Sequence, residues 1–168
     1  MSQEILNNVD RVDIGCGASE QRYSGCFGVD INDDYHPDLL HNCDDGIPLQ
    51  TESVSFVNSD NSLEHFKNPY FVLKECYRIL KPGGTMRLVV PNCQWFPLIF
   101  VNMFLDLDWV WHQWMHSPMK QERGLHWTLY TRFLITKVAI DIGFEVSERR
   151  GFLYSKEIEL SLIKRHDS

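Results

Sequence analysis

The sequence has no excess of cations, no paired-cysteine motif and no hydrophobic run long enough to cross a bilayer. Its 16 Lys and Arg residues face 23 Asp and Glu residues, for a formal net charge of −7 at pH 7. Affinity for a phosphate backbone comes largely from Lys and Arg, so we expect no nucleic acid as the main partner. The longest apolar run, residues 95–105, is about half the ~20 residues that a transmembrane helix needs. We therefore expect no membrane span.

The number and spacing of the cysteines are also informative. Five are present, at positions 16, 26, 43, 76 and 93, and none belongs to a C-x-x-C pair. An odd count with no signal peptide indicates reduced thiols. We therefore expect a cytoplasmic protein whose cysteines are small core residues.

Apolar strands alternate with turns and helical segments along the chain. A chain of 168 residues is expected to form one domain, residues 1–168, and the alternation predicts a mainly parallel α/β sheet. Strands are expected near residues 11–15, 26–31, 39–43, 54–59, 84–90, 144–150 and 157–164. The last two have no helix between them, so we expect that pair to be antiparallel.

Two helices are marked by their ends. Asn68 as N-cap and Pro69 at the first helical position predict a helix that ends at 81–84. A second is expected from about Thr128 to Ile142, ended by Gly143 in a left-handed conformation. We expect one face of the first helix to be lined by Tyr70, Leu73, Tyr77 and Leu80, and on the second helix Tyr130, Leu134 and Val138 recur at four-residue spacing.

The first two strands lead to the most informative residues. Residues 11–17, Arg-Val-Asp-Ile-Gly-Cys-Gly, end in Gly-x-Gly, and residues 26–31 end in an acid at Asp30. Glycines let a ligand approach the backbone closely, and an acid at the end of the next strand can accept bonds from a ribose diol. A nucleoside cofactor site is the functional interpretation, and a tight structural turn is the alternative.

Six motifs occur in a fixed order. They are Asp13-Ile-Gly-Cys-Gly17, Gly28-Val-Asp-Ile31, Asp44-Asp-Gly-Ile-Pro48, Ser62-Leu-Glu-His65, Arg78-Ile-Leu-Lys-Pro-Gly-Gly84 and Gly143-Phe144. Over residues 10 to 165 the set resembles the class I S-adenosylmethionine-dependent methyltransferases, in particular the small type-11-like domains. The resemblance implies a Rossmann-like, doubly wound, mostly parallel seven-stranded sheet with an antiparallel last strand. It also implies S-adenosyl-L-methionine as cofactor and S-adenosyl-L-homocysteine as product.

The resemblance assigns cofactor roles to particular residues. Gly15, Cys16 and Gly17 would pass under the methionine portion, Asp13 would face its ammonium group, Asp30 would hold the ribose hydroxyls, and Ile31 would pack on the adenine. Asp44 or Asp45, followed by Gly46, would reach the adenine amino group, with Ile47 and Pro48 closing the far side. Ser59, Asp60 and Asn61 would lie at the methionine end beside the entering acceptor.

One segment departs from the family pattern. Only residues 18–25 remain for the first helix, and Ser19 replaces the usual third glycine. We expect one helical turn or a loop there, with modest cofactor affinity or a partner subunit completing the pocket.

Residues 94–127 form an aromatic-rich insertion that contains all five tryptophans. In the family such an insertion builds a lid over the acceptor, so a hydrophobic, ring-bearing or sugar acceptor is expected. A homodimer or partner contact and a plain core helix are the alternatives.

Histidines supply the candidate catalytic groups. His126 is the first candidate general base and His65 the second, although hydrogen-bonded packing explains His65 and a helix start explains Glu64 equally well. His112 and His116 have metal-ligand spacing, but no carboxylate or cysteine completes the set convincingly, so no metal is predicted.

We expect methyl transfer from S-adenosylmethionine to a small-molecule or glycan-precursor acceptor. The alternative is a noncatalytic S-adenosylmethionine-binding module or regulatory subunit.

Overall fold

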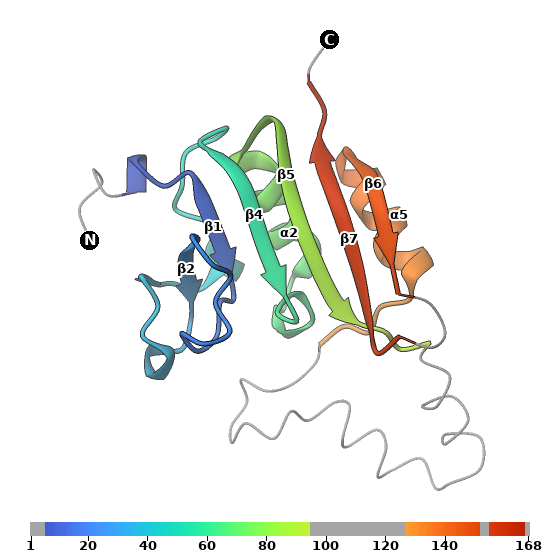
Figure 1. Cartoon of the computed structure of the whole chain (residues 1–168), viewed down its shortest axis with the longest axis horizontal. Coiled ribbons are helices and arrows are strands. Elements are labelled where there is room, and N and C mark those ends of the chain that lie inside the picture. Colours follow the sequence, from blue (N-terminus) through green and yellow to red (C-terminus); the bar gives the residue numbers. More distant parts are fainter. Residues whose placement is uncertain (1–5, 95–126, 152–154, 167–168) are drawn as a thin grey trace, which may run out of the picture.

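The computed structural model describes residues 6–94, 127–151 and 155–166. Its centre is a seven-stranded sheet of order β3-β2-β1-β4-β5-β7-β6 (Figure 1). The strands are β1 Arg11–Ile14, β2 Phe27–Asp30, β3 Leu39–Leu40, β4 Val54–Asp60, β5 Leu80–Pro91, β6 Phe144–Arg150 and β7 Glu157–Lys164. Pairing is parallel from β3 through β5, and β7 is antiparallel to both of its neighbours. The mostly parallel sheet with an antiparallel last strand is confirmed.

The helices begin at the caps that the sequence contains. In α2, Pro69–Ile79, the side chain of Asn68 accepts a hydrogen bond from the Phe71 N–H, so the predicted N-cap is confirmed. In α5, Arg132–Ile142, Thr131 caps the Leu134 N–H. Single 3-10 turns lie at η1 Asp33–Tyr35, η2 Cys43–Asp45 and η3 Leu63–His65.

Three element boundaries differ from the prediction. The second long helix begins at Arg132 instead of about Thr128, because Tyr130 is paired with Asn92 in a β-bridge. β3 is two residues long because the side chain of Asn42 caps η2 directly after it. β5 begins at Leu80, four residues earlier than expected.

The residues expected to share one face of each helix are only partly buried. Tyr70 and Leu134 are about half exposed, and Leu80 belongs to β5. The residues that face the sheet are Val72, Leu73, Cys76 and Ile79 on α2, and Ile135, Thr136 and Ala139 on α5. A four-residue repeat finds a stripe along a helix, whereas the contact with the sheet decides which stripe is buried.

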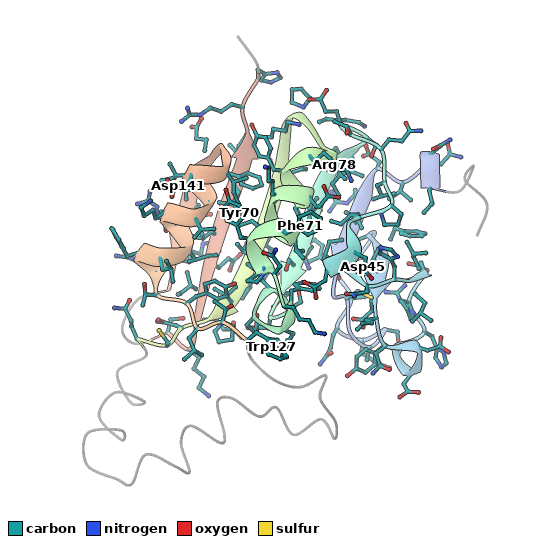
Figure 2. All side chains as sticks on the ribbon, turned by 180° about the vertical axis from the view of Figure 1, so that it is seen from behind. Asp45, Tyr70, Phe71, Arg78, Trp127 and Asp141 are labelled. Carbon is teal, nitrogen blue, oxygen red and sulfur yellow. The ribbon has the colours of Figure 1, made fainter. Side chains whose placement is uncertain are left out.

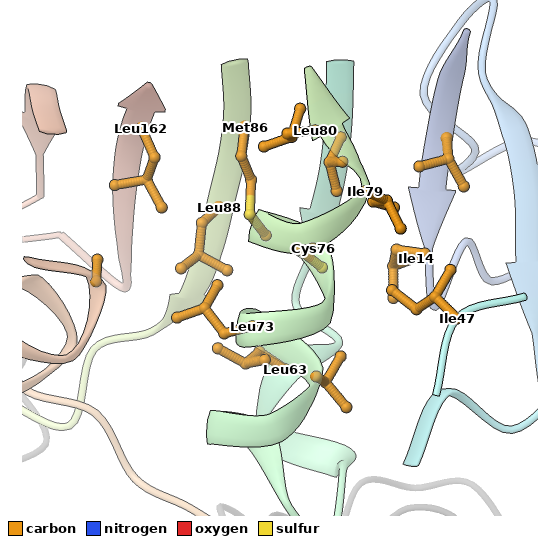
Figure 3. Packing of buried hydrophobic residues seen from close by; sticks show 14 of the residues in the cluster. Ile14, Ile47, Leu63, Leu73, Cys76, Ile79, Leu80, Met86, Leu88 and Leu162 are labelled. Carbon is orange, nitrogen blue, oxygen red and sulfur yellow. The ribbon is translucent and has the colours of Figure 1, made fainter. Parts of the chain in front are cut away.

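The core lies between α2 and the sheet. Leu73 and Cys76 of α2 meet Met86 and Leu88 of β5, all of them almost fully buried, while Ile14 at the end of β1 packs beside the helix (Figure 3). Burying a side chain of this size contributes about 1.5–3 kcal/mol. This packing fixes the end of β1, from which the Gly-x-Gly segment departs.

α2 and α5 cover the same face of the sheet (Figures 1 and 2). In the described part of the chain the opposite face carries no helix, and residues 18–25 form turns instead, as expected. Tyr23 from this segment packs on Phe56 with ring centroids 5.3 Å apart, and the Arg87 guanidinium lies over the Tyr23 ring. No helix among the described residues is long and apolar enough to cross a membrane.

Candidate functional site

Four of the predicted cofactor residues lie at the carboxyl ends of β1 and β2, namely Gly15, Cys16, Gly17 and Asp30. Gly15 and Gly17 have φ of +65° and +60°, the left-handed region that glycine adopts without strain. The Gly15 and Cys16 N–H groups donate to the Val29 carbonyl at 2.8 and 3.2 Å. This turn fastens the Gly-x-Gly segment to β2.

Asp30 joins the two strand ends. Its Oδ2 accepts from the Gly17 N–H at 3.0 Å and its Oδ1 from the Asn32 N–H at 2.8 Å. A carboxylate has about four acceptor positions, so about two remain on Asp30 for a diol. The next residue, Ile31, is 52% exposed, although it is a large apolar side chain. An acceptor pair beside an exposed apolar side chain suits a ribose that carries a flat base.

Asp13 has a different set of partners from the one expected. It is 2% exposed, and its oxygens accept from the Tyr23 N–H at 2.8 Å and the Asn58 side-chain amide at 2.6 Å. Burial raises the pKa of Asp13, and these two bonds oppose the rise. Asp13 therefore holds the 18–25 segment against the sheet, and each of its two oxygens has a donor from the protein.

Asp13 ends a polar chain that crosses four strands. Asn58 Oδ1 accepts from Arg87 Nη1 at 3.1 Å, and Arg87 Nε donates to Glu159 at 3.1 Å. Arg87 also pairs with Asp60 at 2.6 Å. These groups lie on the face of the sheet opposite α2 and α5, where they replace the apolar packing that a covering helix would need.

The segment after β3 lies beside the N-terminus of α2. The oxygens of Asp44 accept from the Lys67 and Asn68 N–H groups at 3.1 and 2.9 Å. Asp45 is exposed and accepts from Asn42 at 3.1 Å. Asp44 thus holds the chain at the N-terminus of α2, which Asp45 does not. An oxygen of either residue can accept a hydrogen bond from a base.

The two residues after Asp45 are anchored to the fold. Gly46 has φ of +100°, and its carbonyl is 2.7 Å from His41 Nε2. Ile47 is 3% exposed and packs in the core, and Pro48 is exposed. The N–H of Ile47 donates to Glu75 at 3.0 Å, and its carbonyl accepts from Arg78 at 2.8 Å.

The residues at the end of β4 divide into structural and exposed groups. The Ser59 hydroxyl is buried 2.8 Å from that of Ser62, which donates to the Ile14 carbonyl at 2.8 Å. Asp60 is exposed and ion-paired to Arg87. Asn61 has φ of +47° and donates to Glu157 at 3.0 Å.

Glu64 is the residue whose setting sequence reasoning missed. It is 1% exposed, its Oε2 has no hydrogen-bond partner among the described residues, and burial raises the pKa of Glu64 to about 8. His65, the second candidate base, is adjacent, with Nε2 3.9 Å from Glu64 Oε1. The Leu-Glu-His motif named both residues, but a local pattern carries no signal that the carboxyl group is enclosed.

The chain segments that flank the aromatic insertion lie close to Glu64. The Trp127 N–H donates to the Glu64 carbonyl at 2.8 Å, and the Cys93 N–H donates to the Tyr130 carbonyl at 3.1 Å. Trp127 and Arg78 lie at opposite ends of α2 (Figure 2). Trp127 is 54% exposed. The chain therefore leaves β5 and returns toward α5 beside Glu64.

Several predicted residues fall outside the described ones. His126, the first candidate base, lies there, as do His112, His116 and the other four tryptophans. Over residues 6–94, 127–151 and 155–166, no group of three or more His, Cys, Asp or Glu side chains is placed to hold a metal ion. All five cysteines are free thiols.

An apolar pocket of about 190 Å³ lies between α2, η3 and α5. It is lined by Leu63, Pro69, Tyr70, Leu73, Thr128, Tyr130, Leu134, Ile135 and Val138. The pocket lies on the helical face, so it is separate from the ends of β1 and β2.

Comparisons with known proteins agree with this geometry. Residues 12–88 match the model of a family described as "Methyltransferase domain". No curated protein matches the sequence significantly. Among solved structures, the methyltransferase in complex with the Trm112 methyltransferase activator of Haloferax volcanii is similar, with a TM-score of 0.71 and 16% identity over 99% of this chain and 89% of that chain.

Two further structures show the same fold. An S-adenosylmethionine-dependent methyltransferase from Methanosarcina mazei has a TM-score of 0.68 and 18% identity over 99% of both chains. Another, from Thermotoga maritima, has a TM-score of 0.69 and 17% identity over 94% of this chain and 83% of that chain.

Proposed function

We propose that this chain transfers the sulfonium methyl group of S-adenosylmethionine to a small-molecule or glycan-precursor acceptor. It has the fold of the class I S-adenosylmethionine-dependent methyltransferases, whose cofactor is S-adenosylmethionine. The observation that carries the proposal is the hydrogen bond by which Asp30 links the carboxyl ends of β1 and β2. There Asp30 holds the Gly17 N–H, keeps acceptor positions for a diol, and stands next to the exposed Ile31. The cofactor supplies an already activated methyl group.

The proposed cofactor contacts follow the strand ends. Gly15, Cys16 and Gly17 lie under the methionine portion, Asp30 binds the ribose, and Ile31 faces the adenine. Asp44, Asp45 and Gly46 form the adenine side, whereas Ser59, Asp60 and Asn61 border the methionine end. The contribution that we propose for Asp13 is indirect, because its side chain is 2% exposed and holds Tyr23 and Asn58.

The acceptor is proposed to enter at the ends of β4 and β5, where residues 94–127 leave and rejoin the described fold. His126, directly before Trp127, and His65 are the candidate bases at this end. The aromatic content of the insertion supports a hydrophobic, ring-bearing or sugar acceptor, or a homodimer or partner contact. We also propose a cytoplasmic location, in line with five free thiols.

A noncatalytic S-adenosylmethionine-binding module is the second candidate function. The observation that favours it is the lack of a helix in residues 18–25, because this segment would flank the cofactor. Complex formation of the Haloferax volcanii protein with an activator shows that a protein of this fold can work with a second subunit.

The experiment that separates the two functions has two stages. Calorimetry with S-adenosylhomocysteine tests cofactor binding, with a nicotinamide dinucleotide as control ligand. Transfer of isotope-labelled methyl groups to panels of amines, phenols and sugar nucleotides then tests catalysis. Binding without transfer to any panel favours the noncatalytic module, and preference for the dinucleotide contradicts both functions.

A further inference from the structure

Glu64 has a buried carboxyl group near the end of β4, and it makes none of the proposed cofactor contacts. The side chain is 1% exposed, and Oε2 has no hydrogen-bond partner among the described residues. Leaving a buried polar atom unpaired destabilises the folded state. Native proteins keep few such atoms, and functional sites are one reason to keep them.

Two acidic side chains near Glu64 act in the same direction as its burial, although one of them, Asp60, is ion-paired to Arg87. Asp60 from β4 and Glu157 from β7 add to the effect of burial in raising its pKa to about 8. The charge of Glu64 in turn contributes to the raised pKa of Tyr130, for which burial is the larger cause, while Thr128 opposes it. A carboxyl group in this setting is mostly neutral at pH 7, and its smaller ionised fraction is a stronger base than an exposed carboxylate.

Backbone contacts fix Glu64 on the acceptor side of the site. Its carbonyl holds the Trp127 N–H, while Tyr130 is paired to Asn92 at the end of β5. In open α/β sheets, ligands bind beyond the carboxyl ends of the strands. Glu64 therefore lies at the carboxyl end of β4, beside the segment that returns toward α5.

We propose that Glu64, in place of an imidazole, is the catalytic residue that contacts the nucleophilic hydroxyl or amine of the acceptor and takes its proton during methyl transfer. The inference rests on the proposed function. A lone pair of the nucleophile forms the bond to the methyl carbon, and the carbon–sulfur bond breaks with its electron pair on sulfur. The proton of the nucleophile passes to the Glu64 carboxylate.

The same surroundings restrict the class of acceptor. Asp60 and Glu157 add negative charge near Glu64, which favours an acceptor that presents a neutral hydroxyl or amine at this end. The side chain of His65 is 27% exposed and is the neighbour through which the proton then reaches solvent. His65 is thus a positioning and relay residue, and Glu64 is the group that touches the acceptor.

The test uses the charge difference between two ligands and needs no acceptor. S-adenosylmethionine carries a sulfonium cation, whereas sulfur is neutral in S-adenosylhomocysteine. An opposite charge within ~4–6 Å shifts a pKa by about 1–3 units. If Glu64 faces the methyl group, it ionises between pH 6.5 and 9.0 beside the sulfonium cation. The ratio of the affinity for S-adenosylmethionine to that for S-adenosylhomocysteine then rises by about tenfold or more.

Calorimetry at both pH values compares the full-length protein with Glu64→Gln and with Glu148→Gln, which removes an exposed carboxylate on β6. We expect the pH-dependent ratio to be lost in Glu64→Gln and retained in Glu148→Gln. Titration of the ligands' own amino groups is common to all variants and cancels in this comparison. Glu64→Asp, which withdraws the charge by one methylene, is expected to give an intermediate ratio and decides the test if Glu64→Gln fails to fold.

Two results overturn different claims. If both ligands bind and the ratio has the same pH dependence in the wild type and both Glu64 variants, the role of Glu64 is wrong and the proposed function stands. If neither ligand binds the folded wild-type protein, the proposed function itself is wrong.

Discussion

Ser62 fills the space that a side chain on Gly15 would need. A Cβ atom at Gly15 would lie 2.4 Å from Ser62 Cβ and 2.9 Å from its hydroxyl oxygen. Ser62 also donates to the Ile14 carbonyl at 2.8 Å, just before the turn. The glycine motif after β1 thus packs against Ser62, the first residue of the Ser-Leu-Glu-His motif, and the two motifs depend on each other.

We expect Gly15→Ala to lower the free energy of unfolding by about 2–4 kcal/mol, from a strained left-handed residue and a steric clash. Gly25→Ala is the matched control, because Gly25 has φ of +74° and no heavy atom within 4 Å of the added Cβ. The control should lose only about 1–2 kcal/mol. Urea unfolding measures both, and equal losses would show that Ser62 yields to the new side chain.

Asp30→Ala is expected to weaken S-adenosylhomocysteine binding by about 1.5–3 kcal/mol, the range for hydrogen bonds to a charged group, or roughly tenfold to over a hundredfold. Asp33→Ala is the control, since Asp33 is an exposed acid of η1. Calorimetry on folded samples gives both affinities. If the two variants bind equally well, Asp30 does not belong to the site.

The positions of the strands along the chain were predictable because strand periodicity and turn residues are local properties, and the missing helix between the last two strands predicted their antiparallel pairing. Gly15, Gly17 and Asp30 were placed together correctly for the same reason, since each follows a strand end that the sequence marks. The partners of Asp13 were not predictable. Tyr23 and Asn58 reach it from distant parts of the chain, and only the sheet register brings Asn58 opposite Asp13.

The burial of Glu64 also could not be predicted from the local sequence. The sequence places a Glu beside a His after β4, and an exposed helix start fits that pattern. Enclosure depends on residues from β7 and from the segment before α5, which approach Glu64 through long-range packing. A charge on a short turn therefore gives no local sign that its pKa is changed.

Arg78 connects α2 to the adenine side of the proposed site. Its guanidinium donates to the Ile47 and Leu49 carbonyls and to Glu75, all at 2.8–2.9 Å. Lys cannot reproduce this planar set of donors. We expect Arg78→Lys to lower the free energy of unfolding by about 1–2 kcal/mol and to weaken S-adenosylhomocysteine binding.

The exposed Arg150, ion-paired to Glu148 on β6, supplies the control for that substitution. Arg150→Lys should change neither stability nor affinity measurably, because exposed ion pairs contribute little. Urea unfolding and calorimetry on both variants check this. An unchanged affinity in Arg78→Lys would mean that the 46–51 segment does not form part of the cofactor site.

The raised pKa of Glu64 also makes stability depend on pH in a defined direction. Between an ordinary value near 4.5 and the folded value of about 8, the native state holds a proton that the unfolded chain has lost. The free energy of unfolding therefore falls as pH rises through this window, by about 1.4 kcal/mol per pH unit at most. Glu64→Gln removes this contribution, so its stability should exceed that of the wild type increasingly toward pH 8.5.

Urea unfolding at pH 5.5, 7.0 and 8.5 measures that difference. Asp13, whose pKa is also raised by burial, is present in both proteins, so its contribution cancels in the comparison. Glu148→Gln, which removes an exposed carboxylate, should follow the wild-type curve. If Glu64→Gln and the wild type instead lose stability in parallel, Glu64 is already ionised at pH 5.5 and water reaches it in the folded protein.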